Sequence, residues 1–86
     1  MVDYNEVLRK MKADLPGEIN GVKEYAMLSK MAEETDHDCW ASMLKQMAWE
    51  EHTHAKHIMH MLEKNGVSYA EYENAYKEAE KMLHDL

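Results

Sequence analysis

Glu51 and His54 are the residues of this chain whose types and spacing best suit metal chemistry. They are three positions apart, so on a helix both point to the same side of one turn. One turn then presents a carboxylate oxygen and an imidazole nitrogen to the same cation, and the second carboxylate oxygen can reach a neighbouring cation. Glu-x-x-His is the ligand pair that supports two-metal carboxylate sites in helical bundles.

Both residues fall on an apolar stripe with helical periodicity. Its members follow steps of four and three: Trp40, Leu44, Met47, Glu51, His54, Ile58 and Met61. A carboxylate and an imidazole are costly on such a stripe unless they are paired or bind a metal. We therefore predict a metal site here. The alternatives are an ion pair between the two residues and side chains that face solvent.

Glu18 is the third predicted ligand. It belongs to a similar stripe on the preceding helix, formed by Glu18, Val22, Tyr25, Ser29 and Ala32. Glu18 lies 17 residues before Thr35, whereas Glu51 and His54 lie 16 and 19 residues after it. If the chain turns back near Thr35, equal rise per residue puts all three at one height. The alternative is that Glu18 is an acidic residue in the first turn of a helix, where the helix dipole favours it.

The elements that position these residues are predicted to be helices. The 86 residues include only three Gly and one Pro, and β-branched residues are sparse. We predict helices over residues 3–12, 15–34, 37–64 and 69–84. Asp14 before Leu15-Pro16 is typical of a helix start, and Asn65-Gly66 is typical of a helix end. The chain is then a single domain, residues 1–86, with a metal-binding hairpin over about residues 15–64 and a C-terminal helix over about residues 69–84.

Counting ligands predicts the assembly. A four-helix carboxylate site uses four Glu and two His, and this chain supplies half of them as Glu18, Glu51 and His54. A lone hairpin would also leave its apolar stripe half uncovered. We therefore expect an all-α antiparallel helical hairpin with short flanking N- and C-terminal helices, which dimerises about a two-fold axis into a four-helix bundle. Carboxylates with one imidazole per metal favour iron or manganese.

Composition excludes several other classes of function. The net charge of −7 argues against binding to a nucleic-acid backbone. No apolar run approaches the roughly 20 residues that a membrane span needs, and no secretion leader is recognisable. The single cysteine, Cys39, permits neither an intrachain disulfide nor a cysteine-ligated zinc or rubredoxin-type iron site within one chain. We expect a cytoplasmic protein.

About the middle three-fifths of the chain, residues 15–64, resembles the first half of a rubrerythrin-type ferritin-like domain. The residues that carry this resemblance are Gly17-Glu18, Tyr25, Ala32-Glu33-Glu34 and Glu51-His52-Thr53-His54-Ala55-Lys56. The chain is also similar to the two-helix encapsulated ferritins, whose half-bundles pair to build an iron site. The resemblance implies a non-haem di-iron centre that oxidises Fe(II) with oxygen or peroxide. It places the metal ligands on Glu18, Glu51 and His54 and a neighbouring tyrosine on Tyr25.

The sequence departs from these families in two respects. No cysteine pair is present to hold a rubredoxin electron donor, and no Gly/Ser-rich tail with an apolar tag follows the last predicted helix. We therefore expect neither the complete peroxidase cycle of rubrerythrin nor delivery into an encapsulin shell.

Other readings of the same residues remain open. Glu51 and His54 could fix the register of a plain helical dimerisation module, or the site could store or sense metal without turnover. Tyr25 is either a neighbour of the site or a core residue. His52, His57 and His60 lie off the stripe and are expected to be exposed.

Overall fold

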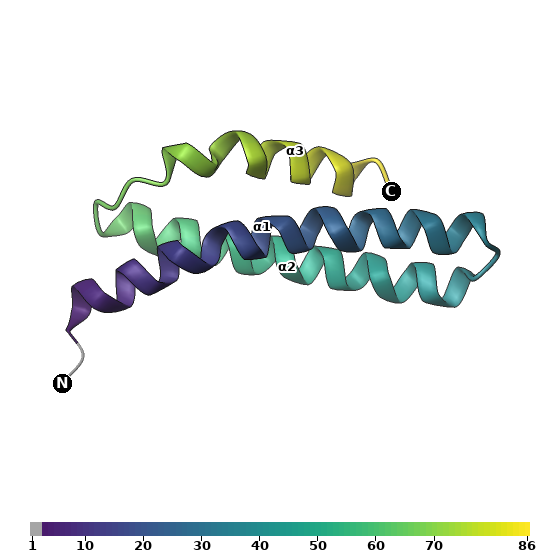
Figure 1. Ribbon diagram of the computed structural model, residues 1–86, viewed down its shortest axis with the longest axis horizontal. Coiled ribbons are helices and arrows are strands. Elements are labelled where there is room, and N and C mark those ends of the chain that lie inside the picture. The colour runs from purple at the N-terminus through teal and green to yellow at the C-terminus, as the bar shows by residue number, and fades with distance from the viewer. Residues whose placement is uncertain (1–2) are drawn as a thin grey trace.

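The computed structural model describes residues 3–86, and within them every regular element is a helix. The elements are α1 (Tyr4–Glu34), α2 (Asp38–Lys64), the short 3₁₀ helix η1 (Ala70–Tyr72) and α3 (Glu73–His84). α1 and α2 form a long antiparallel hairpin, and α3 runs back along one side of it (Figure 1). The prediction of an all-α chain with a central hairpin and a C-terminal helix is confirmed, although the C-terminal α-helix begins at Glu73 and the predicted first turn is the 3₁₀ helix η1. No helix in the described part of the chain has the length and apolar character to cross a membrane.

The predicted break between a short first helix and the second helix is wrong. α1 is continuous and contains Pro16. Pro16 lacks the N–H that would pair with the carbonyl of residue 12, and proline inside a helix bends it. The first turns of α1 are indeed turned away from the rest of the helix in Figure 1. The helix continues because Leu8 and Leu15, on either side of the predicted break, are both buried in the same core.

The hairpin is held together by residues spaced seven apart on each helix. On α1 the buried residues of this series are Leu8, Leu15, Val22 and Ser29, and on α2 they are Ala41, Ala48, Ala55 and Leu62. Such spacing keeps one seam facing the partner helix along the full hairpin, as in a coiled coil. The small alanines leave little bulk on the α2 side of the seam.

The turn between α1 and α2 is fixed by polar contacts. The Ser29 hydroxyl is buried and donates a 2.7 Å hydrogen bond to the carbonyl oxygen of Ala41 across the hairpin. The Thr35 hydroxyl donates to the carbonyl oxygens of Met31 and Ala32 at the end of α1. Asp36 turns the chain with a φ of 60°, a left-handed conformation that Asp tolerates better than most residues. These contacts set the register in which α2 returns along α1.

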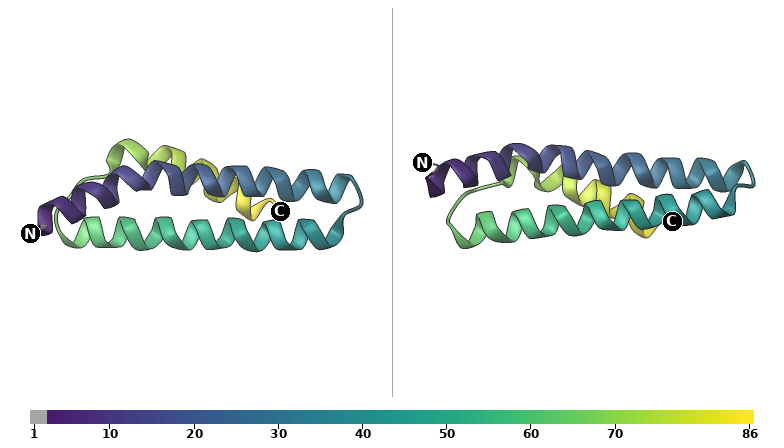
Figure 2. Two further views of the ribbon diagram at one scale, coloured as in Figure 1. Left: turned by 60° about the horizontal axis from the view of Figure 1, so that its bottom comes forward. Right: turned by 90° about the horizontal axis from the view of Figure 1, so that it is seen from below.

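α3 packs on one face of the hairpin through Ala79 and Leu83, which are both buried. Ion pairs from Lys12 to Glu71 and from Lys23 to Glu78 tie the η1–α3 segment to α1. Seen from below, α1 and α2 lie next to each other with α3 behind them (Figure 2, right). The hairpin therefore has one face covered by α3 and one open face.

His52 was expected to be exposed, and that expectation is wrong. Only 6% of the residue is accessible to solvent. Its Nε2 lies 2.8 Å from Glu80 Oε2 and 2.9 Å from the Tyr76 hydroxyl, both on α3. The Tyr76 hydroxyl also donates to Glu80 at 3.2 Å. His52 faces α3 and not the predicted stripe, so it fastens the third helix to the hairpin.

Replacing His52 with Ala is expected to lower the free energy of unfolding by about 1–3 kcal/mol, because the half-buried Tyr76 and Glu80 on α3 lose their hydrogen bonds to a buried side chain. α3 should then exchange its amide hydrogens faster than α1 and α2 do. Urea denaturation and hydrogen exchange test this, with His60→Ala at an exposed position of α2 as the control. Equal stability of the two variants would contradict the role assigned to His52.

The predicted stripe on α2 lies on the hairpin but is not buried by the chain itself. Trp40, Met47 and Met61 are 58%, 38% and 43% exposed. Leu44 and Ile58 are half-buried. These exposures confirm the expectation that a lone hairpin leaves the stripe about half uncovered. α3 does not change this, because it covers the other face of the hairpin.

Candidate metal centre

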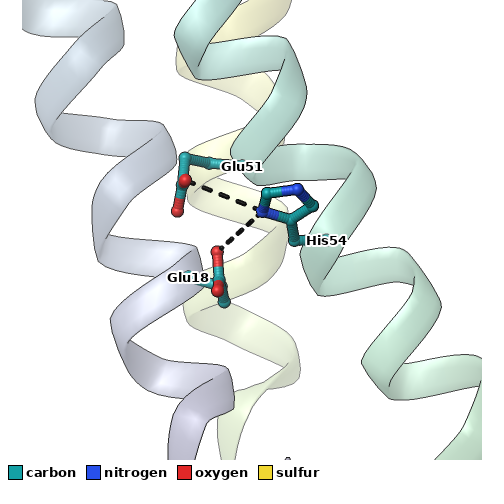
Figure 3. Close-up of side chains that lie close together, drawn as sticks. All are labelled: Glu18, Glu51 and His54. Carbon is teal, nitrogen blue, oxygen red and sulfur yellow. Dashed lines mark hydrogen bonds and ion pairs between the residues drawn. The ribbon is translucent and has the colours of Figure 1, made fainter.

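Glu18, Glu51 and His54 come together between α1 and α2 at mid-height of the hairpin (Figure 3). His54 Nδ1 lies 3.3 Å from Glu18 Oε2 and 3.7 Å from Glu51 Oε1. One potential ligand atom from each of the three residues lies within 4.8 Å of the others. The prediction that the three side chains share one height is therefore confirmed.

The positions of the three residues follow from the helices that carry them. Glu51 and His54 are one turn apart on α2 and point to the same side. Glu18 stands opposite them because the antiparallel register brings the middle of α1 beside the middle of α2. α1 begins at Tyr4, so Glu18 lies well inside the helix. The alternative interpretation, that position 18 is acidic because it lies in the first turn of a helix, is therefore wrong.

The spacing of these atoms fits a single small divalent cation. Ligand atoms about 2.1 Å from an ion are about 3 Å apart when adjacent and about 4.2 Å apart when opposite. The two distances from His54 Nδ1 lie within this range. Two carboxylates and one imidazole are also a donor set that iron, manganese and zinc accept. The cluster therefore needs only small side-chain movements to offer three ligands.

The two carboxylates of the cluster stand close enough to affect each other's ionisation. The hydrogen bond between Glu51 and Glu18 is the largest cause that raises the pKa of Glu51, followed by burial and by the negative charge of Glu18. His54 opposes the shift, and the net effect brings the pKa of Glu51 to about 7. Without a cation, the pair therefore retains a proton near neutral pH.

This shift makes the stability of the metal-free protein depend on pH. The unfolded chain releases the Glu51 proton near the ordinary value of 4.5, whereas the folded chain holds it up to about pH 7. The folded state thus binds the extra proton between these values, and the free energy of unfolding falls as the pH rises through them. We expect the free energy of unfolding to fall by about 2 kcal/mol between pH 5 and pH 8. This is less than the full pKa shift implies, because 25% of the Glu51 side chain is exposed and water screens its charge.

Urea denaturation with a chelator present measures this loss. The Glu51→Gln protein is the control, since glutamine keeps the shape of the protonated acid and does not ionise. Its stability should depend less on pH than that of the wild type. The same pH dependence in both proteins would show that Glu51 does not carry the shift.

Tyr25 lies in the core packing and has no polar link to the cluster. It is half-buried and packs against the apolar core, and no hydrogen bond joins it to the three residues in the described part of the chain. The packing of Tyr25 agrees with its interpretation as a core residue. His57 and His60 are exposed, as expected.

Gly21 is a residue of the site that the sequence analysis did not identify. A Cβ atom at this position would lie 2.7 Å from Glu51 Oε2, so the Glu51 side chain rests against the α1 backbone. A glycine inside a long helix lowers helix stability and therefore calls for a local explanation. The sequence shows a glycine in the middle of a predicted helix, but it does not show that Glu51 lies against that glycine.

Comparisons of the chain with protein-family models, with curated proteins and with solved structures found no match. The assignment of a function consequently depends on the site and on the sequence motifs alone.

Proposed function

We propose that this chain is a ferritin-like protein that binds and oxidises Fe(II) at a two-metal centre shared by two copies of the chain. The observation that carries the proposal is the convergence of Glu18, Glu51 and His54 from two helices onto one point of the hairpin. The rubrerythrin-like motifs contain the same three residues. Manganese suits the same donors and is the second candidate metal.

The number of ligands supports a site completed by a second copy. Three protein donors serve one ion and leave a pair of ions short of the four Glu and two His that a bundle site uses. The three residues lie between α1 and α2 with α3 behind them, so a second hairpin has access to the site (Figure 3). A two-fold axis through this region doubles the donors to the complete set.

The apolar surface around the site supports the same assembly. Exposed Trp40, Met47 and Met61 flank the ligands along α2, and Val7 is 47% exposed on α1. A second hairpin laid across this surface would remove these side chains from water and shield the ligands. In the single chain the His54 side chain is 55% exposed and that of Glu18 is 27% exposed, so one copy leaves the ligands open to water.

The acidic pair is prepared for a cation. Glu51 holds a proton near neutral pH because Glu18 stands beside it. A divalent cation can take the place of that proton and neutralise both carboxylates, while His54 supplies an uncharged nitrogen donor. Glu51, whose side chain lies against the α1 backbone, would hold metal together with Glu18 and His54.

The chemistry attributed to bound iron is the transfer of one electron from each of two Fe(II) ions to oxygen or peroxide. With oxygen and two protons the products are two Fe(III) and hydrogen peroxide. With hydrogen peroxide and two protons they are two Fe(III) and two water molecules. The role of the chain is to hold the two ions together and to supply negative charge that stabilises Fe(III) over Fe(II).

Stopped-flow absorbance tests this proposal. Protein loaded anaerobically with Fe(II) is mixed with air-saturated buffer or with peroxide, and ferric absorbance in the near ultraviolet is followed. We expect ferric iron to form faster than in buffer without protein and faster than with the Glu51→Ala protein. Fe(II) binding without any acceleration would instead favour metal storage or sensing. Absence of binding would favour a dimerisation module in which Glu51 and His54 set the register.

A further inference from the structure

The Glu51 side chain lies so close to the backbone of α1 at Gly21 that no residue with a Cβ atom would fit there without displacing it. Gly21 lies in the interior of α1, and a Cβ built on it would stand 2.7 Å from Oε2 of Glu51 and 3.2 Å from both Cδ and Cγ. Cβ atoms are not found as close as the first of these distances, so an alanine here would force the Glu51 side chain to move. Three atoms of the Glu51 side chain therefore occupy the space next to the Gly21 backbone that a side chain at this position would fill.

We propose that Gly21 is a positioning residue, whose missing side chain keeps open the space in which the Glu51 carboxylate meets Glu18 and His54. This inference deepens the proposed function and rests on it for the consequence for metal binding. The contact itself is a property of the metal-free chain. The glycine lowers the stability of α1, because a helix with glycine in its interior is less stable than the same helix with alanine.

Gly17 provides a matched control one turn earlier on the same helix. A Cβ at Gly17 would meet no atom within 4 Å. Both glycines lie in the interior of α1, so both gain the same helix propensity when replaced by alanine. The two substitutions differ in whether the new methyl group meets Glu51.

The first experiment compares Mn(II) binding to wild type, Gly17→Ala and Gly21→Ala by isothermal titration calorimetry. We expect Gly17→Ala to bind as the wild type does and Gly21→Ala to bind about 10-fold or more weakly, the range seen when a ligand loses its supporting contact. Melting temperatures of both variants should equal or exceed that of the wild type, which separates a displaced ligand from a damaged fold. Equal affinity of Gly21→Ala and wild type would overturn the proposal.

The second experiment requires no metal, so it distinguishes failure of this inference from failure of the proposed function. Gly21→Ala is made in the wild type and in the Glu51→Ala background, and the melting temperatures are compared in a double-mutant cycle. With the Glu51 side chain removed, the methyl group introduced by Gly21→Ala meets no carboxylate, and the gain in melting temperature should be larger than in the wild type. Identical gains in the two backgrounds would overturn the contact, whatever the result with metal.

Discussion

The Glu51→Gln protein is expected to lose metal binding while it keeps its fold. Glutamine has nearly the size of glutamic acid and resembles the protonated form that Glu51 holds near neutral pH in the metal-free chain. It cannot provide the negative charge or the second oxygen donor that two ions require. Loss of an outer contact to a ligand costs roughly 10–100-fold in affinity, so loss of the ligand itself should cost about 100-fold or more.

Calorimetric titration with Mn(II), which air does not readily oxidise, measures this effect. Circular dichroism and urea denaturation of the same samples establish that the variant is folded. Glu50→Gln is the matched control, because Glu50 is exposed, its hydrogen bond is to Gln46 on the same helix, and its charge is the smallest of the causes that shift the pKa of Glu51. A Glu51→Gln protein that binds Mn(II) as tightly as the control would remove Glu51 from the site.

The second large effect is expected when the apolar stripe is charged at its two ends. Trp40 and Met61 are exposed on α2 at positions 11 residues before Glu51 and 7 residues after His54. Burying a side chain of this kind contributes about 1.5–3 kcal/mol, and each substitution occurs twice in a symmetric dimer. The double variant Trp40→Glu, Met61→Glu should therefore raise the dimer dissociation constant by at least about 100-fold.

This variant keeps all three ligands, yet it should bind Mn(II) more weakly because its site is no longer completed. Analytical ultracentrifugation with and without metal gives the dissociation constant. Gln46→Glu, His60→Glu changes two exposed residues elsewhere on α2 and serves as the control. A charged-stripe variant that dimerises and binds as well as this control would place the interface elsewhere.

The sequence predicted the hairpin and the helix ends near residues 34, 38 and 64 because each end carries a strong local signal. Asn65-Gly66 illustrates this, since Gly66 adopts the positive φ of 71° that favours glycine after a helix. The break between residues 12 and 15 was predicted by the same kind of local signal, Asp14 before Leu15-Pro16, and is wrong. Burial of Leu8 and Leu15 along one continuous core outweighs the hydrogen bond that proline removes.

The proximity of Glu18, Glu51 and His54 was predictable, because it depends only on the helix rise per residue and on the position of the turn. The roles of His52 and Gly21 were not predictable in this way. His52 faces α3, and the docking of a third helix cannot be read from the period of α2. Gly21 gains its meaning from a side chain 30 residues away on another helix.

Native mass spectrometry of the metal-loaded protein tests the central claim most directly, because it counts chains and metal ions in one particle. Protein equilibrated anaerobically with Fe(II), or with Mn(II), should appear as two chains of 10.1 kDa with two metal ions. The Glu51→Gln protein should appear without bound metal. A wild-type monomer that holds its own metal ion, or a dimer that holds none, would contradict a site built from two halves.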